Sequence, residues 1–373
     1  MADTAKYPGR TRPPTERLYA AIMAGGSGTR FWPLSRRDRP KQLIRLFGGR
    51  SLLSATAERL RPLCPPERWL VVTAERLAAA VAAELPDLPA GHAICEPVPR
   101  NTAPCMVLAA AAARARDPEA IIALLPADHF VSDPDAFRAA LAIAADHADR
   151  GHIVTLGVKP GRPETGYGYI ERGRIVEDAG NDAVYDVVRF VEKPDQDTAV
   201  DYLAGGRHLW NAGVFVVRAD VAIREAARHL GLGISPLLAA LADVPFPSAA
   251  FHDAVDASFA AATSISIDHG IAEKARNLRV VPLDAGWSDV GAWQSLLEHK
   301  DRRADHFERG DVLALESPGS VLVTDGPFLA ALGLPGVAII VSGDAVLALP
   351  VERAQEVRRV VTHLEQAGRD ELL

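Results

Sequence analysis

The residues of this chain with the clearest chemical potential form a glycine-rich loop after a short apolar run. The run Leu18–Met23 leads into a loop of small residues that ends in a cation: Ala24, Gly25, Gly26, Ser27, Gly28, Thr29 and Arg30. Glycine allows the backbone to fold closely around an anion and to point several N–H groups at it. Lys41, in Pro40-Lys41-Gln42, adds a compact positive charge. The loop therefore predicts a site for phosphate groups.

Two common phosphate-binding patterns do not fit this loop. A Walker A loop needs Gly-Lys-Ser/Thr after the glycines, and that string is absent. The dinucleotide-binding pattern needs a third glycine where Phe31 stands. Taken alone, Gly25–Gly28 fits an ordinary strand-to-helix connection equally well.

Two aspartates are candidates for holding a metal ion. Asp128 follows the apolar run Ile121–Leu125, and ligand sites in open α/β sheets lie beyond the carboxyl ends of strands. Asp289 lies far along the chain in Gly286–Gly291. Mg²⁺, or Mn²⁺ in its place, takes one or two carboxylates together with substrate phosphates. Each aspartate alone also fits a helix cap or a turn, and we interpret His129 as a structural neighbour.

The elements expected to position these residues alternate between strands and helices. Four apolar runs predict buried strands: Leu18–Met23, Trp69–Thr73, Ile121–Leu125 and Ile153–Val158. Two helices are expected between them, Ser51–Leu63 and Thr102–Ala115. This alternation predicts an α/β fold with a doubly wound, mixed but mainly parallel sheet.

The pattern changes after Gly166. Further strands are expected at Tyr167–Ile170, Arg174–Glu177, Val184–Glu192, Val214–Val217 and Leu278–Pro282, with a helical region at Asp220–Ala262. Four short β segments then precede a closing helix at Ala354–Gln366: Val312–Leu315, Ser320–Thr324, Val337–Val341 and Ala345–Leu349. We expect a flexible leader over residues 1–17, a catalytic domain over 18–300, and a small β-rich domain over 301–373 that folds back or forms a dimer contact.

Composition narrows the functional classes. The 41 Lys and Arg against 48 Asp and Glu give a net charge of -7, which lacks the basic field of a nucleic-acid-binding protein. The chain has three cysteines, an odd number that does not suggest a disulfide framework. It has no apolar run of about 18 residues, which a membrane span would need. Met1–Glu16 does not resemble a secretory signal. A cytoplasmic protein without a membrane span is expected.

The full string from Gly25 to Arg30, with Pro40-Lys41, resembles the signature of the sugar nucleotidyltransferase family. The resemblance implies a Rossmann-like catalytic domain in which the loop and Lys41 wrap a nucleoside triphosphate. It implies that Arg30 and Lys41 handle the phosphates and that Asp128 and Asp289 hold the metal, the latter within Trp287–Trp293.

Further strings resemble the mannose-1-phosphate guanylyltransferase branch of that family. They are Glu96–Pro104, Arg162–Ile170, Phe190–Pro194, Trp210–Gly213 and Ser266–Lys274. The resemblance places Asn101 and Thr102 near the nucleotide and assigns sugar-phosphate contacts to Gly168, Glu192, Lys193 and Asn211. Alone, each string fits a turn or a solvated pair. His269–Ala272 departs from the branch pattern, which weakens the assignment of Asp268–Lys274.

The reaction that the resemblance implies joins GTP and mannose 1-phosphate to give GDP-mannose and pyrophosphate, and a homodimer is expected. Three alternatives remain open: a sister enzyme with another base or sugar, a silent regulatory subunit, and an NAD-dependent dehydrogenase disfavoured by Phe31. The chain ends at Leu373, so no added isomerase domain is expected.

Overall fold

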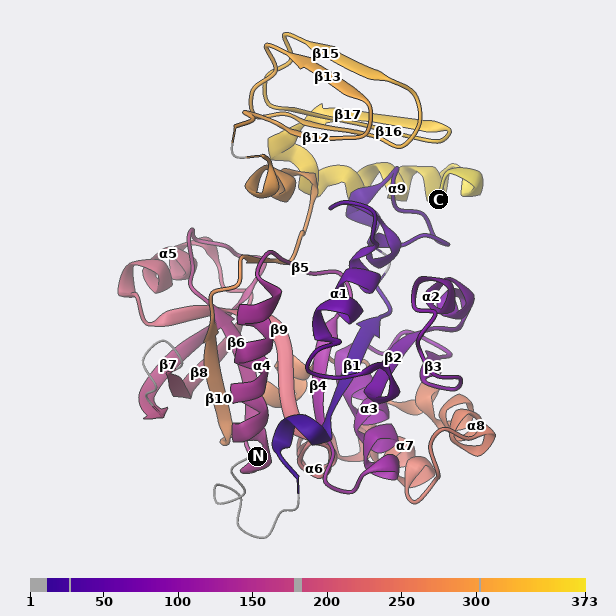
Figure 1. Ribbon diagram of the computed structural model, residues 1–373, viewed down its shortest axis with the longest axis vertical. Coiled ribbons are helices and arrows are strands. Elements are labelled where there is room, and N and C mark those ends of the chain that lie inside the picture. The colour runs from indigo at the N-terminus through magenta and orange to yellow at the C-terminus, as the bar shows by residue number, and fades with distance from the viewer. Residues whose placement is uncertain (1–11, 27, 178–182, 302) are drawn as a thin grey trace. The chain divides into compact units, whose positions relative to one another are not determined.

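A computed structural model describes residues 12–26, 28–177, 183–301 and 303–373. The chain divides into two compact units (Figure 1). Unit 1 comprises Met1–Gly25, Thr56–Ala127 and Val131–Trp287, and unit 2 comprises Gly26–Ala55, Asp128–Phe130 and Ser288–Leu373. The domain boundary expected near residue 300 falls inside unit 2, and the expected division into domains stays a prediction.

Over the described residues, unit 1 is built on a nine-stranded sheet with the order β3-β2-β1-β4-β9-β6-β10-β8-β7. Strands β1 to β4 are parallel to one another, as are β6 and β10, whereas β9 runs antiparallel to β4 and β6. The bounds are β1 (Leu18–Ala24), β2 (Trp69–Ala74), β3 (Ala93–Glu96), β4 (Ile121–Pro126), β6 (Ile153–Val158), β7 (Gly168–Glu177), β8 (Val184–Glu192), β9 (His208–Arg218) and β10 (Leu278–Leu283). The expected doubly wound, mixed sheet is confirmed.

The glycine-rich loop begins where the strand order reverses. β1 lies between β2 and β4, and the chain adds β2 and β3 on one side before it crosses to β4 on the other. Ala24 pairs in register with Thr73, whose Oγ1 donates to the Ala24 carbonyl at 3.1 Å. Such a switch point is where open α/β sheets bind ligands.

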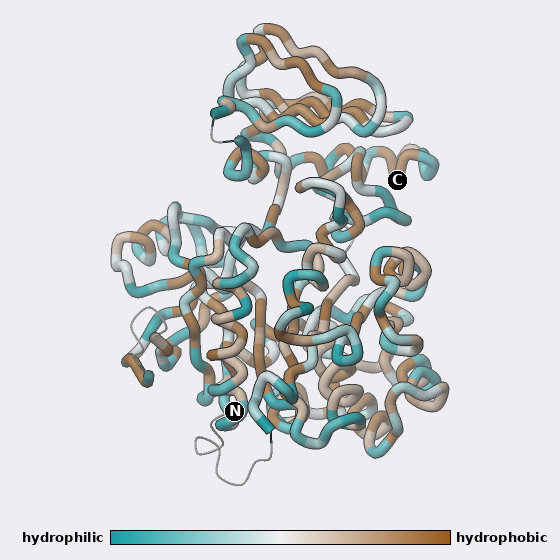
Figure 2. Tube along the Cα trace, in the orientation of Figure 1, coloured by the Kyte–Doolittle hydropathy of each residue, from teal (hydrophilic) through white to brown (hydrophobic). Residues whose placement is uncertain are grey.

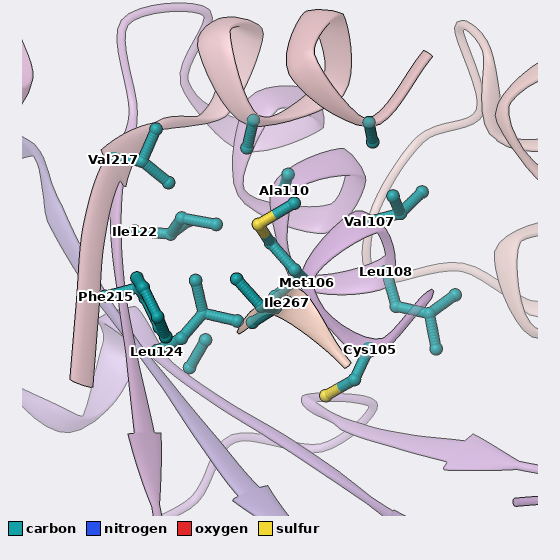
Figure 3. Close-up of a cluster of buried hydrophobic side chains, with 14 of the residues drawn as sticks. Cys105, Met106, Val107, Leu108, Ala110, Ile122, Leu124, Phe215, Val217 and Ile267 are labelled. Atoms are coloured by element: carbon teal, nitrogen blue, oxygen red, sulfur yellow. The ribbon is translucent and has the colours of Figure 1, made fainter. Parts of the chain in front are cut away.

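Helices and strands of unit 1 share an apolar core. The unit 1 helices are α2 (Ala78–Glu84), α3 (Thr102–Arg116), α4 (Pro134–Asp149), α5 (Gln196–Gly205), α6 (Ala219–Leu230), α7 (Ser235–Leu241) and α8 (Ala249–Ser258). Met106 of α3 packs with Ile122, Leu124, Phe215 and Val217 of the sheet (Figure 3). In Figure 2 the central strands are coloured largely as hydrophobic, in keeping with burial on both faces. α4 packs across β4, β6, β9 and β10.

Unit 2 combines the loop segment with a small parallel β structure. Its sheets have the orders β12-β14-β16-β17 and β13-β15, and all pairings are parallel except that of β16 with β17. The bounds are β12 (Phe307–Arg309), β13 (Val312–Leu315), β14 (Val321–Thr324), β15 (Leu329–Leu332), β16 (Val337–Ser342) and β17 (Ala345–Pro350), followed by helix α9 (Val357–Gln366). Phe31, Trp293, Val323, Ile340 and Val361 belong to one core, so the loop segment and α9 fold together.

Three short elements lie at the points where the chain passes between the units: α1 (Leu52–Leu60), β5 (Phe130–Val131) and β11 (Trp287–Ser288). Single-turn helices connect many other elements, among them η3 (Thr29–Phe31), η4 (Lys41–Leu43) and the π-helical turn η10 (Asp268–Ala272). None of the helices in the described ranges is long and apolar enough to span a bilayer.

Most expected strands are present, with differences at short or irregular elements. The two segments expected at Tyr167–Ile170 and Arg174–Glu177 form the single strand β7, and β9 extends back to His208. Within the expected flexible leader, Pro14–Arg17 forms a packed turn and Arg12 pairs with Asp117. Residues 1–11 lie outside the described residues.

A buried ion pair fixes the start of β1. The Arg17 guanidinium lies 3.0 Å from the Asp149 carboxylate, and the side chains are only 0% and 4% exposed. We predict that Arg17→Met lowers the free energy of unfolding by about 3–5 kcal/mol, because it removes the cation that compensates a buried carboxylate. Urea unfolding measures the change. Arg174→Met, at the exposed pair with Asp186, is the control and should cost at most about 1 kcal/mol. Equal losses in the two variants would contradict this account.

Candidate active site

The glycine-rich loop is held by hydrogen bonds to its own carbonyl groups. Gly28 adopts a left-handed conformation (φ 59°) at the start of η3, and Ser35 Oγ donates to its carbonyl at 2.9 Å. Gln42 Nε2 donates to the carbonyl of Gly26 at 3.3 Å. A side chain at residue 28 would place Cβ 2.6 Å from the Lys41 nitrogen, so only glycine fits there. Ser27, which we expect to bind nucleotide, lies outside the described residues.

The Lys41 ammonium is the centre of a cluster in unit 2. Its Nζ donates to Asp128 Oδ2 at 2.8 Å and to the main-chain carbonyl of Asp289 at 2.6 Å. The Lys41 side chain is 8% exposed, whereas that of Asp128 is 37% exposed. Burial alone would raise the pKa of Asp128, but the charges of Lys41 and His129 and the hydrogen bonds to the carboxylate together outweigh burial and lower the pKa. Asp128 is therefore ionised at neutral pH.

The backbone around Asp289 is strained in a way that presents its carbonyl to Lys41. The next residue, Val290, has φ 47°, which is unfavourable for a β-branched side chain. Val290 is fully buried, and its N–H donates to Ser288 Oγ at 3.1 Å. Packing and this hydrogen bond maintain the conformation. Backbone strain of this kind concentrates at functional sites.

The two predicted metal-binding aspartates thus meet at one lysine. Among the residues that the structure describes, no group of three or more His, Cys, Asp or Glu side chains could form a complete protein cage for a metal. Two carboxylates suit Mg²⁺, which usually takes its remaining ligands from water and phosphate oxygens. The Asp128 carboxylate, with a second aspartate in the same unit, therefore fits a cation that takes most of its ligands from a nucleotide and water.

Arg30 lies in the same unit and has an unusual electrostatic environment. Burial lowers the pKa of its guanidinium, the nearby Arg358 lowers it further, and Asp289 opposes both effects. Within the described part of the chain, its buried Nε has no hydrogen-bond partner. The Arg30 guanidinium therefore has unused donor capacity.

The predicted nucleotide-binding residues of unit 1 flank the ends of β1 and α3. Asn101 has φ 64° and caps α3, because its Oδ1 accepts from the Thr102 N–H at 2.9 Å. The Thr102 hydroxyl accepts from the Ile267 N–H at 2.9 Å. A Cβ on Gly25 would lie 3.2 Å from Glu96 Oε2. These residues shape the end of the sheet, and their contacts with a nucleotide stay a prediction.

Glu96, which we did not assign to the site from sequence, is a buried carboxyl group beside Gly25. Burial raises its pKa to about 7. Its Oε1 has no hydrogen-bond partner among the described residues. The residue type alone does not predict the raised pKa of Glu96, because burial by neighbouring segments determines that pKa.

The four predicted sugar-phosphate residues lie together in unit 1. Gly168 of β7 pairs in register with Glu192 of β8, and a Cβ on Gly168 would come within 2.5 Å of Glu192 Oε2 and 3.4 Å of the Asn211 Cβ. Lys193, with φ 50°, pairs with the Glu192 carboxylate. The ring of Tyr167 packs edge-on against Trp210 and Trp287, with centroid distances of 5.2 and 5.7 Å. Carboxylate, amide, ammonium and aromatic groups together suit a phosphorylated sugar.

The orientation of the Asn211 amide is fixed on both sides. Its Oδ1 accepts from Thr155 Oγ1 at 2.9 Å and from the Gly213 N–H at 3.1 Å. Its Nδ2 donates to Asp268 Oδ1 at 2.9 Å. A shift in register between β6 and β9 occurs at this point, and such bulges re-aim side chains near active sites. Sequence reasoning missed Thr155 and gave Asp268 only a weak match.

Comparison with known proteins supports the organisation of the chain. A family model described as nucleotidyl transferase matches residues 19–306, and one described as MannoseP isomerase/GMP-like beta-helix domain matches residues 310–364. A mannose-1-phosphate guanylyltransferase from Escherichia coli is 38% identical over 95% of this chain and 75% of its own length. The mannose-1-phosphate guanylyltransferase RfbM from Salmonella typhimurium is 37% identical over 94% of this chain and 73% of its own.

Among solved structures, a protein from Thermus thermophilus described as mannose-1-phosphate geranyltransferase superimposes with a TM-score of 0.82. It is 38% identical to this chain, and the match covers 94% of this chain and 99% of that one. The likeness therefore extends over both the large sheet and the β-rich C-terminal region.

Asp268 generates a prediction about stability and pH. Burial, and then the charge of Glu192, raise its pKa to about 6. The folded state therefore holds the proton more tightly than the unfolded chain, so the stabilisation from protonated Asp268 is full below pH ~4 and is lost as pH rises through about 6. We predict that Asp268→Asn raises the melting temperature by a few degrees at pH 8 but not at pH 4, because the amide stays neutral. Thermal unfolding at both values measures this.

The exposed Asp201 on α5 provides the control, since Asp201→Asn should have no comparable pH-dependent effect. An Asp268→Asn variant whose change in melting temperature is the same at both pH values would contradict the account.

Proposed function

The chain belongs to the nucleotidyl transferase family, in the branch of the mannose-1-phosphate guanylyltransferases, and we propose that it transfers the guanylyl group of GTP to mannose 1-phosphate. The products are GDP-mannose and pyrophosphate. The observation that carries this proposal is the cluster in which Lys41 binds Asp128 and the Asp289 carbonyl. It combines a fixed cation with the Asp128 carboxylate and the main chain of a second aspartate, and transfer of a nucleotidyl group requires charged groups held in place in this way.

The sugar phosphate acts as the nucleophile without a general base. The second pKa of a phosphate monoester is ~6, so the group is largely dianionic at neutral pH. One of its oxygens attacks the α-phosphorus of GTP, and the bond from that phosphorus to the bridging oxygen of pyrophosphate breaks. No proton has to be removed. The protein must bring polyanions together and neutralise the charge that moves onto pyrophosphate.

We assign the phosphate chemistry to unit 2. Lys41 and Arg30 stabilise the triphosphate and the leaving pyrophosphate. Asp128 and Asp289 would hold Mg²⁺, or Mn²⁺ in its place, and ionised Asp128 suits this role. When bound, the cation neutralises phosphate charge and makes the α-phosphorus more electrophilic.

We assign sugar recognition to unit 1. Glu192 accepts hydrogen bonds from sugar hydroxyl groups, and Asn211 has one Nδ2 hydrogen beyond the one that it donates to Asp268. Lys193 holds the sugar phosphate. Gly168 is required beside Glu192 because a side chain would fill the space that the carboxylate occupies.

The surroundings of the enzyme are also part of the proposal. Cys64, Cys95 and Cys105 are free thiols, in keeping with a reducing cytoplasm. A homodimer is supported by exposed apolar side chains on the β-rich part of unit 2: Leu313, Leu315, Phe328, Leu332 and Val346.

The direct test is release of pyrophosphate from purified protein with Mg²⁺, mannose 1-phosphate and each nucleoside triphosphate in turn. Release with GTP alone supports the proposal. Release only with another triphosphate, or only with glucose 1-phosphate, keeps the reaction class and overturns the substrate assignment. No release from protein that binds GTP would favour a silent subunit of the same fold.

We predict that Lys41→Ala lowers kcat about 10²–10³-fold, because it removes a preorganised donor that meets developing charge. The variant should still fold, with a melting temperature lowered by no more than a few degrees, because Asp128 is partly exposed and water can replace its lost partner. Pyrophosphate release and thermal unfolding measure the two effects. Lys300→Ala is the matched control, since this lysine of unit 2 donates only to the Ala304 carbonyl within the described contacts. Normal turnover in a well-folded Lys41→Ala protein would refute the assigned role.

A further inference from the structure

The C-terminal helix brings a second arginine to the phosphate loop. Val357 and Val361 of α9 are buried in the same core as Phe31, the residue that follows Arg30. This packing holds the first turn of α9 against η3, and Figure 1 shows α9 in yellow beside the indigo segment that carries η3. Arg358 is the second residue of α9 and is exposed. Its guanidinium thus belongs to the same surface of unit 2 as Arg30.

Arg358 differs from the other arginines around the start of α9. Arg353 and Arg359 both pair with Glu356, at 2.7 and 2.6 Å. In the described part of the chain, Arg358 has no such carboxylate partner and no hydrogen-bond acceptor. The buried Nε of Arg30 also lacks an acceptor there. Two guanidinium groups therefore converge with unused donors.

This convergence costs free energy unless an anion is bound. Burial is the main cause of the lowered pKa of Arg30, the charge of Arg358 lowers it further, and Asp289 offsets only part of the effect. Guanidinium groups present planar pairs of N–H donors that match phosphate oxygens. The amino end of α9 adds a further partial positive charge. A polyphosphate is the ligand class that would use all these groups.

We propose that Arg358 of α9, together with Arg30, forms the subsite for the pyrophosphate that leaves the nucleoside triphosphate. The inference rests on the proposed function, and it gives the C-terminal region a direct part in binding substrate. Arg358 contacts the β- and γ-phosphates in the forward reaction and the attacking pyrophosphate in the reverse reaction. Arg30, next to the glycine-rich loop in sequence, binds the same group.

The experiment compares Arg358→Ala and Arg358→Lys with the matched control Arg359→Ala. Arg359 serves as the control because its guanidinium forms an ion pair with Glu356. The reverse reaction, GDP-mannose plus pyrophosphate, separates the KM of each substrate. We expect Arg358→Ala to raise the KM for pyrophosphate about tenfold or more, as loss of charged hydrogen bonds implies, and to leave the KM for GDP-mannose within about twofold. Arg358→Lys should be intermediate, and Arg359→Ala should match the unmodified protein. Equal KM values for pyrophosphate in Arg358→Ala and Arg359→Ala would overturn the proposal.

A calorimetric titration with inorganic pyrophosphate and Mg²⁺ separates this inference from the proposed function. If the unmodified protein does not use GDP-mannose but binds pyrophosphate about tenfold more tightly than Arg358→Ala, the proposed substrates are wrong and the subsite stands. If the unmodified protein and Arg358→Ala bind pyrophosphate equally, or neither binds it, the subsite is wrong. Because Arg358 is exposed, all three variants should retain the melting temperature of the unmodified protein.

Discussion

One ammonium group joins three segments of this chain that lie far apart in sequence. Lys41 Nζ donates to the carboxylate of Asp128 and to the main-chain carbonyl of Asp289, at 2.8 and 2.6 Å. Its position depends on a glycine at residue 28, since any side chain there would collide with the Lys41 backbone. Beside the Asp289 carbonyl, Val290 has a left-handed backbone (φ 47°). The phosphate site is therefore a product of unit 2 as a whole.

Several strained backbone positions lie in the segments that form the candidate site. Of the non-glycine residues with positive φ in the described ranges, Asn101, Lys193 and Val290 lie in segments assigned to substrate binding. The Asp268 carboxyl group, with a pKa raised to about 6, opposes stability at neutral pH in the same way. Both features cost folding free energy that the apolar cores of the two units offset, each within its own unit. They preorganise donors and acceptors before substrate arrives.

Long helices and strands with a strong hydrophobic pattern could be predicted from the sequence, whereas the surroundings of individual side chains could not. The apolar runs that became β1, β2, β4 and β6 are unambiguous because they are buried on both faces. The strands β3, β12 and β15 are only three or four residues long, so they carry little periodic signal. The string Trp210–Gly213 fits a turn by composition, yet tertiary pairing makes it part of β9.

The same limit applies to the site. Residue types and spacing identified Arg30, Lys41, Asp128 and Asp289, and the structure brings all four into unit 2. Glu96, Thr155 and Arg358 were missed, because their features arise only when distant segments pack. These features are the unpaired carboxyl oxygen of Glu96, the hydrogen bond from Thr155 that orients the Asn211 amide, and the proximity of Arg358 to Arg30. The roles of all these residues in catalysis stay predictions until they are measured.

The central claim is direct transfer between two bound phosphates, achieved by positioning and charge neutralisation without a covalent enzyme intermediate. Isotope exchange tests it most directly: the protein is incubated with GTP, Mg²⁺ and radiolabelled pyrophosphate, and the label that enters GTP is measured before and after mannose 1-phosphate is added. The account predicts exchange only after the sugar phosphate is present, because pyrophosphate cannot leave without the second substrate. Exchange at a rate comparable with kcat in the absence of the sugar phosphate would reveal a guanylyl-enzyme intermediate and contradict it.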